Sequence, residues 1–131
     1  MIKRAVDSGI KEVNAVTALT SLDEEQIKYV YGKSPIDTVH DLAILAKMGG
    51  AHGIVCSPQE VGLLSSHSEL RGMKFITPGV RSAGKSADDQ ERIGTPRAAV
   101  DNGATHLVIG RQITQAADPE EALRQIEEEI S

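Results

Sequence analysis

The alternation of short apolar runs with helical segments constrains this chain more than any other feature of its sequence. Three short runs are largely apolar throughout instead of alternating with polar residues: Gly53–Cys56, Lys74–Thr77 and His106–Ile109. Such runs are typical of parallel strands that are covered on both faces. A further β-prone segment extends from Glu12 to Thr20. We therefore predict four parallel strands with helices between them.

The prolines mark where the helices begin. All five prolines directly follow a serine, threonine or aspartate, and four of them, all except Pro78 of the Pro-Gly break, are interpreted as helix starts. Proline is tolerated at the first helical position because its missing N–H would be unpaired there, and the preceding polar side chain can cap the helix. The predicted helix starts are Pro35, Pro58, Pro96 and Pro119. The first of these helices should stop at Gly49–Gly50.

Two shorter helices are predicted near the beginning of the sequence. The capping-box pattern Ser21-Leu-Asp-Glu24 predicts a helix of one or two turns that ends near Gly32. Met1–Gly9 is interpreted as a helix remnant, because apolar residues lie on one side and an N-cap is lacking.

Repeated strand–helix units permit either an open doubly wound sheet or a barrel. Four strands are few for an open sheet, but they make half of an eight-stranded barrel. We therefore predict an α/β fold with parallel (βα) repeats, the half of a TIM-type (βα)8 barrel. It forms one domain over residues 1–131, with the helix remnant in residues 1–11 and four βα units in residues 12–131.

Composition excludes several classes of function. A net charge of -5 without a basic run argues against a nucleic-acid partner. No apolar run approaches the roughly 20 residues of a membrane span. The single cysteine, Cys56, fits a reducing cytoplasm, where we expect the protein to reside. Cys/His clusters with metal-ligand spacing are absent, so a metal site is not expected. His40, His67 and Glu127–Glu129 are interpreted as solvated.

Two arginines follow the last two apolar runs. Arg81 comes after the Pro-Gly break that ends the third run, and Arg111 follows Gly110 at the end of the fourth. In barrels, sites lie at the C-terminal ends of the strands, and the loops after the last two strands often bind phosphate. The two arginines therefore indicate a pocket for an anion such as a phosphate. His52 and His106 stand at strand starts and are interpreted as structural.

The same region allows a second interpretation. Gly79–Ser86 satisfies the pattern G-x-x-x-x-G-K-[ST] of nucleotide-binding P-loops. The segment after it lacks the apolar stripe that the required helix should show. Nor does an apolar strand that ends in aspartate follow to hold magnesium. A P-loop nucleotide hydrolase therefore remains the weaker alternative.

Several segments taken together resemble a known enzyme family. The matching segments, which keep the order and spacing of that family, are Ala15–Ser21, Gly53–Ser57, Phe75–Arg81, Asp88–Gln90 and Val108–Arg111. In these segments the chain resembles bacterial-type orotidine 5'-monophosphate decarboxylase. The resemblance covers only the C-terminal half of that family's barrel, its last four βα units.

This resemblance implies an activity and a set of binding residues. The family converts orotidine monophosphate to uridine monophosphate, the last step of pyrimidine nucleotide synthesis, without cofactor or metal. By resemblance, Arg111 grips the phosphate beside the backbone N–H of Gly110. Arg81 closes over the phosphate and ribose, and Gln90 bridges the phosphate and the pyrimidine carbonyl. Thr20 lies near the base.

One departure from the family separates binding from catalysis. The family's chemistry uses an Asp-x-Lys-x-x-Asp array, and no such array occurs in these 131 residues. The resemblance therefore implies no catalytic residue in this chain. A non-catalytic half-barrel that binds a phosphate ligand stays open as an alternative. Because a four-strand arc leaves two open edges, we expect a homo-oligomer or a complement with an N-terminal half-barrel.

Overall fold

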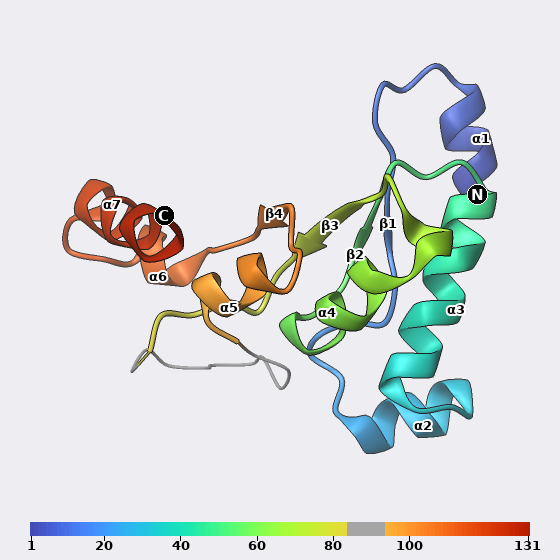
Figure 1. Cartoon of the computed structure of the whole chain (residues 1–131), viewed down its shortest axis with the longest axis horizontal. Helices are drawn as coiled ribbons and strands as arrows, with labels where there is room; N and C mark the ends of the chain where they lie inside the picture. The colour runs from blue at the N-terminus through green and yellow to red at the C-terminus, as the bar shows by residue number, and fades with distance from the viewer. Residues whose placement is uncertain (84–93) are drawn as a thin grey trace.

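A single parallel sheet organises the computed structural model, which describes residues 1–83 and 94–131 (Figure 1). Its strands are β1 (Asn14–Val16), β2 (Gly53–Val55), β3 (Lys74–Thr77) and β4 (His106–Leu107). Their order in the sheet follows the chain, β1-β2-β3-β4, and each neighbouring pair is parallel. A doubly wound sheet reverses its strand order at a switch point. The unreversed order is that of a barrel arc, as predicted.

Helices separate the strands throughout the described residues. Their bounds are α1 (Ile2–Asp7), α2 (Glu24–Tyr31), α3 (Pro35–Met48), α4 (Pro58–Ser66), the 3-10 turn η1 (Ser68–Leu70), α5 (Pro96–Asp101), α6 (Arg111–Thr114) and α7 (Pro119–Ile130). All four predicted proline starts are confirmed. The side chain before each proline accepts a hydrogen bond from a backbone N–H of the first turn, and these caps are Ser34, Ser57, Thr95 and Asp118.

The predicted cap of α2 is wrong by two residues. Asp23 is the cap: its side chain accepts from the Gln26 N–H at 2.7 Å, while the Gln26 side chain accepts from the Asp23 N–H at 3.1 Å. The pattern is a capping box of the kind expected at Ser21, but it satisfies the backbone N–H groups of Asp23 and Gln26. The helix ends at Gly32, as predicted, with a φ of 71° in the left-handed region.

The outer strands are shorter than the sequence predicted. β1 covers three residues of the expected Glu12–Thr20 segment, and β4 covers two residues of His106–Ile109. Both strands lie at an edge of the sheet and pair on one side only within the described residues. An edge strand has hydrogen-bonding partners on one side only, so its regular pairing ends sooner than that of a central strand. An apolar pattern therefore overestimates the length of such strands.

The core lies between the sheet and the helices. Consecutive parallel strands joined by right-handed crossovers place their helices on one face of the sheet. Ala15, Ile54 and Phe75 are in register and belong to the buried cluster on this face. They pack with helix residues that are also buried, among them Val39 of α3 and Val61 of α4.

The opposite face of the sheet carries a second apolar row. Val16, Val55 and Ile76 are in register one position further along the strands. Val16 is 61% exposed, and Val55 and Ile76 are half-buried. Parallel sheets are normally covered on both faces. The described residues do not cover these three side chains, which we call the concave row.

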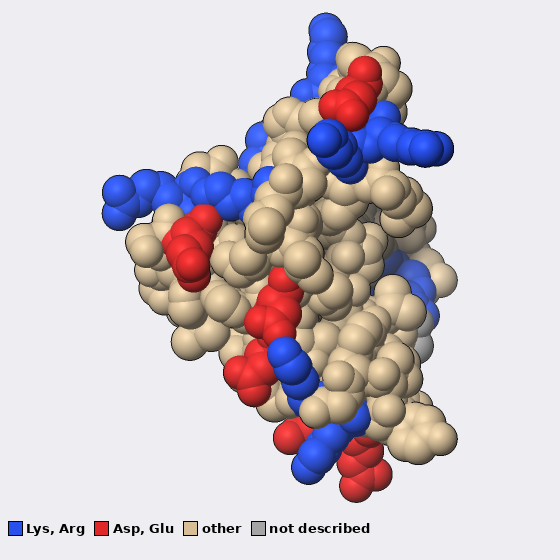
Figure 2. Space-filling view, turned by 90° about the vertical axis from the view of Figure 1, so that its right-hand side faces the viewer, with Lys and Arg blue, Asp and Glu red and all other residues tan. Residues whose placement is uncertain are grey.

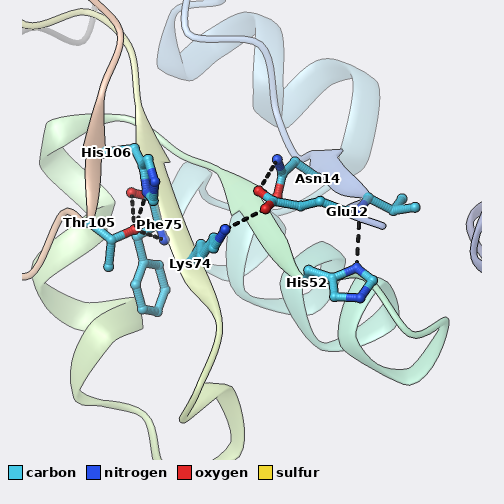
Figure 3. A network of polar contacts seen from close by, with 8 residues as sticks. Glu12, Asn14, His52, Lys74, Phe75, Thr105 and His106 are labelled. Carbon is cyan, nitrogen blue, oxygen red and sulfur yellow. Dashed lines mark hydrogen bonds and ion pairs between the residues drawn. The ribbon is translucent and has the colours of Figure 1, made fainter. Parts of the chain in front are cut away.

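A polar network holds the N-terminal ends of the strands together (Figure 3). Lys74 on β3 pairs with Glu12, and Asn14 donates from Nδ2 to Glu12 Oε1 at 3.0 Å. The Val13 N–H donates to His52 Nδ1 at 3.1 Å, which is the structural role expected for that histidine.

Charged side chains are spread over the outer surface of the helices. Figure 2 shows several basic side chains at the top, where α1 lies, and both acidic and basic side chains down the middle and at the lower end, with uncharged areas between them. Exposed apolar side chains on α2 and α3 include Tyr29 and Leu45. Within residues 1–83 and 94–131, none of the helices combines the length and apolar character needed to cross a bilayer.

Replacing Gly53 should destabilise the sheet. A Cβ at this position would lie 2.9 Å from Lys74 Cβ and 2.8 Å from Ile76 Cδ1. Gly53→Ala should therefore lower the free energy of unfolding by about 1–3 kcal/mol, as overpacking does. The matched control is Gly62→Ala in α4, where the nearest atoms would be 3.5 Å away. That change should be neutral or stabilise by up to about 1 kcal/mol. Equal effects of the two substitutions in chemical denaturation would contradict the crowding described.

The Glu12–Lys74 pair should make stability depend on pH. The hydrogen bond from Lys74, with a smaller one from Asn14, lowers the pKa of Glu12 below its ordinary value of 4.5. A carboxylate whose pKa is lowered by folding stabilises the fold above its unfolded pKa, and this contribution disappears as pH falls through the folded pKa. Glu12→Gln should therefore reduce Tm slightly at neutral pH, and the deficit should disappear as pH falls below 4.5 and through the lowered pKa of Glu12, and also at high salt. A Tm difference that stays constant over that pH range would argue against the pair.

Candidate functional site

The C-terminal ends of β3 and β4 form the rim that carries the predicted arginines. Beyond β3 the chain turns at Gly79, whose φ of 76° favours glycine. It then forms a parallel bridge between Val80 and Gly94. The Arg81 N–H donates to the Gly94 carbonyl at 2.9 Å, and the Gly94 N–H donates to the Gly79 carbonyl at 3.1 Å. The two ends of the intervening segment are thereby fastened together at the rim.

Gly94 also fits this junction against the start of α4. A Cβ there would approach Pro58 Cβ to 2.7 Å, so a side chain at this position would push the junction away from α4. The residues that follow β2 therefore contribute to the position of Arg81.

Two hydrogen bonds join the segments that follow β3 and β4. The Ser82 N–H donates to Gln112 Oε1 at 3.0 Å, and Gln112 Nε2 donates to Ser82 Oγ at 2.7 Å. The Ser82 hydroxyl in turn donates to Glu129 of α7 at 2.6 Å. Glu129 was expected to be solvated, and that expectation is wrong because α7 folds back onto this rim. Ser82 and Gln112 each directly follow a predicted phosphate-binding arginine.

The two arginines have different surroundings. Arg81 is buried, with 8% of its surface exposed, and its Nη1 donates to the Val80 carbonyl at 2.9 Å. Arg111 is the exposed first residue of α6, and Gly110 precedes it as the N-cap. Open space surrounds the position that a Cβ of Gly110 would occupy.

The remaining predicted site residues are not brought to the same place by the described structure. Thr20 is half-buried in the turn after β1, and β1 forms the edge of the sheet opposite to β4. Gln90 lies outside the described residues, as do Gly84, Lys85 and Ser86 of the alternative P-loop pattern.

A buried carboxylate at the end of β2 was missed from the sequence. Ser57 is fully buried and Glu60 is 2% exposed. The Ser57 N–H donates to Glu60 Oε2 at 2.8 Å, and the Ser57 hydroxyl bonds to the same oxygen. The spacing Ser-Pro-x-Glu, a capping box that contains proline, was the available signal. This box fixes the start of α4 at the same end of the sheet.

His40 and His67 are a second departure from the sequence-based interpretation. Both were expected to be solvated, yet both are half-buried. Their ring centroids are 4.5 Å apart, with an angle of 49° between the ring planes. The contact joins α3 to the end of α4, two elements whose proximity the sequence pattern does not reveal.

Comparison with known proteins identifies the family. The family model described as "Orotidine 5'-phosphate decarboxylase / HUMPS family" matches residues 1–126. The chain belongs to this family. The resemblance inferred from the sequence motifs is thereby confirmed.

Individual members of the decarboxylase family are closely similar in sequence. The orotidine 5'-phosphate decarboxylase of Erythrobacter litoralis is 50% identical over 117 residues, which cover 88% of this chain and 51% of that relative. The decarboxylase of Nitrosococcus oceani is 48% identical over 120 residues, covering 89% of this chain and 50% of that relative. The chain thus spans about half the length of the curated relatives it matches.

The fold agrees with a solved structure of the family. The crystal structure of orotidine 5'-phosphate decarboxylase from Lactobacillus acidophilus superposes with a TM-score of 0.77 at 31% identity. The match covers 100% of this chain and 58% of that one. The four parallel strands of this chain therefore correspond to about half of a decarboxylase barrel.

Proposed function

We propose that this chain supplies the phosphate- and base-binding half of an orotidine 5'-monophosphate decarboxylase, which forms uridine 5'-monophosphate. The observation that carries the proposal is the pair of hydrogen bonds between Ser82 and Gln112. They hold the loops after β3 and β4 against each other, and each loop carries an arginine next to the bonded residue. Barrel enzymes commonly bind phosphate with the loops at this rim.

Arg111 and Gly110 would bind the phosphate first. A guanidinium can donate two parallel hydrogen bonds to phosphate oxygens, and Arg111 is exposed at the rim. The open space beside Gly110 leaves room for the phosphate to approach the backbone N–H. Arg81 would exchange its bond to the Val80 carbonyl for the phosphate, with Gln90 bridging to the pyrimidine and Thr20 near the base.

The chemical step would require a second half of the barrel. Decarboxylation releases carbon dioxide and leaves a carbanion, which the lysine of the family's Asp-x-Lys-x-x-Asp array protonates at the vacated carbon. That array is missing from these 131 residues. The groups of this chain would bind and orient the substrate, so that phosphate binding energy serves the reaction. Without a second half, the chain would be a non-catalytic binding module, which is the second candidate function.

The open concave row supports an assembly with another polypeptide. Val16, Val55 and Ile76 line the face that a barrel would close over. A second copy of the chain or an N-terminal half-barrel would cover this row and pair with the edge strands β1 and β4.

Binding of uridine monophosphate should depend on Arg111. Loss of charge-assisted hydrogen bonds in Arg111→Ala should weaken binding of uridine monophosphate roughly tenfold to a hundredfold in calorimetric titration. Uridine, which lacks the phosphate, should bind the wild-type chain no better than it binds the variant. Arg97→Ala is the control, because Arg97 is exposed on α5 and bonds to Asp101. Unchanged affinity in Arg111→Ala would refute the assigned role. Tight binding of ATP–magnesium in preference to uridine monophosphate would favour the P-loop alternative.

Activity should appear on complementation. Mixing the chain with the N-terminal half of the Erythrobacter litoralis decarboxylase should release carbon dioxide from orotidine monophosphate, whereas either half alone should be inactive. Replacing the lysine of the added Asp-x-Lys-x-x-Asp array by alanine should abolish the activity, which is the matched control. Association of the halves without turnover would leave only the binding module. If the isolated chain sedimented as a monomer at micromolar concentration, the proposal that another polypeptide covers the concave row would be contradicted.

A further inference from the structure

Three side chains that can bind a metal converge on the helical layer. His40 lies in α3, His67 caps the end of α4 and Glu69 lies in η1. One ligand atom from each residue lies within 4.8 Å of the other two. Ligand atoms around a tetrahedral zinc ion are about 3.4 Å apart, given bond lengths near 2.0–2.1 Å. Reaching that spacing would require rotation of the exposed Glu69 side chain together with small adjustments of the two imidazole rings.

The His40 ring has one nitrogen near a carboxylate and its other nitrogen buried. Its Nδ1 lies 3.7 Å from Asp41 Oδ1, and Asp41 is itself paired with Lys33. Its Nε2 is buried and lacks a hydrogen-bond partner in the structure. A buried polar atom without a partner costs free energy unless something satisfies it. A carboxylate beside one ring nitrogen favours the proton there and leaves the other nitrogen to bind a metal.

The surrounding structure fixes the cluster and leaves it accessible. Lys47 of α3 donates from Nζ to the Glu69 carbonyl at 2.6 Å and to the Arg71 carbonyl at 2.9 Å. These bonds hold the η1 turn against α3. An open cavity beside the cluster is lined by His40, Asp41 and Glu69 together with two apolar residues of α3, Ile44 and Leu45. An ion and its remaining water ligand can enter from this side.

We propose that His40, His67 and Glu69 bind one divalent transition-metal ion of the zinc class. Two imidazoles and one carboxylate are a donor set that suits zinc, and cobalt or nickel can replace it. The ion fastens α3 to the turn between α4 and β3. Because the site requires the folded arrangement of these elements, metal binding stabilises the fold. The site lies on the helical layer, and its occupancy is independent of the substrate proposal.

Metal titration of the intact chain tests this site. Zinc in competition with a chromophoric chelator should bind at one ion per chain, and cobalt should give the intense visible absorption of tetrahedral coordination. His67→Gln and Glu69→Gln should each weaken binding by at least roughly tenfold. His67 lies at the end of α4 and Glu69 in η1, so these variants should fold even if a change at His40, whose Nε2 is buried, does not. His106→Ala, which changes a histidine on β4, should retain the affinity.

Thermal unfolding gives a second readout. Zinc should raise Tm of the wild-type chain and of His106→Ala, and this shift should disappear in Glu69→Gln. Equal zinc affinity in wild type, His67→Gln and Glu69→Gln would overturn the proposal. So would a titration that fits only several weak ions per chain.

Discussion

The sheet is parallel and carries its helices on one face, and the rest of the structure depends on that arrangement. A strand order that follows the chain puts every crossover on the same side of the sheet. Among the described residues, the main buried cluster therefore lies beneath the helices, around Ile54 and Phe75. The concave face keeps Val16, Val55 and Ile76 as an apolar row with Val16 largely exposed. The described residues leave this second face without the hydrophobic burial that the helical face has.

The two ends of the sheet have separate roles. At the N-terminal ends, the Glu12–Lys74 pair and the His52 contact join neighbouring strands. At the C-terminal ends, glycines and short polar side chains join loops, as at Gly94 and at the Ser82–Gln112 pair. This division places the Glu12–Lys74 ion pair at the end of the sheet opposite to the rim that would bind substrate. It agrees with the general arrangement of barrel enzymes, in which chemistry is confined to the C-terminal face.

Local signals in the sequence predicted the element boundaries that depend on neighbouring residues. A proline after a capping residue marked the starts of α3, α4, α5 and α7, because capping involves only the first turn of a helix. The same kind of reasoning failed by two residues at α2, where Asp23 and Ser21 are both competent caps. Strand length was overestimated at β1 and β4, since pairing at an edge depends on a neighbour that lies far away in the sequence.

The sequence by itself determined the family, the parallel strand–helix repetition and the absence of the Asp-x-Lys-x-x-Asp array, because each is written in the order and spacing of residues. Only the tertiary structure brought Ser82 to Gln112 and Glu129, and His40 to His67 and Glu69. These residues are separated along the chain by whole helices and strands. Their contacts arise from how the helices pack against the sheet, so no local pattern could have predicted them.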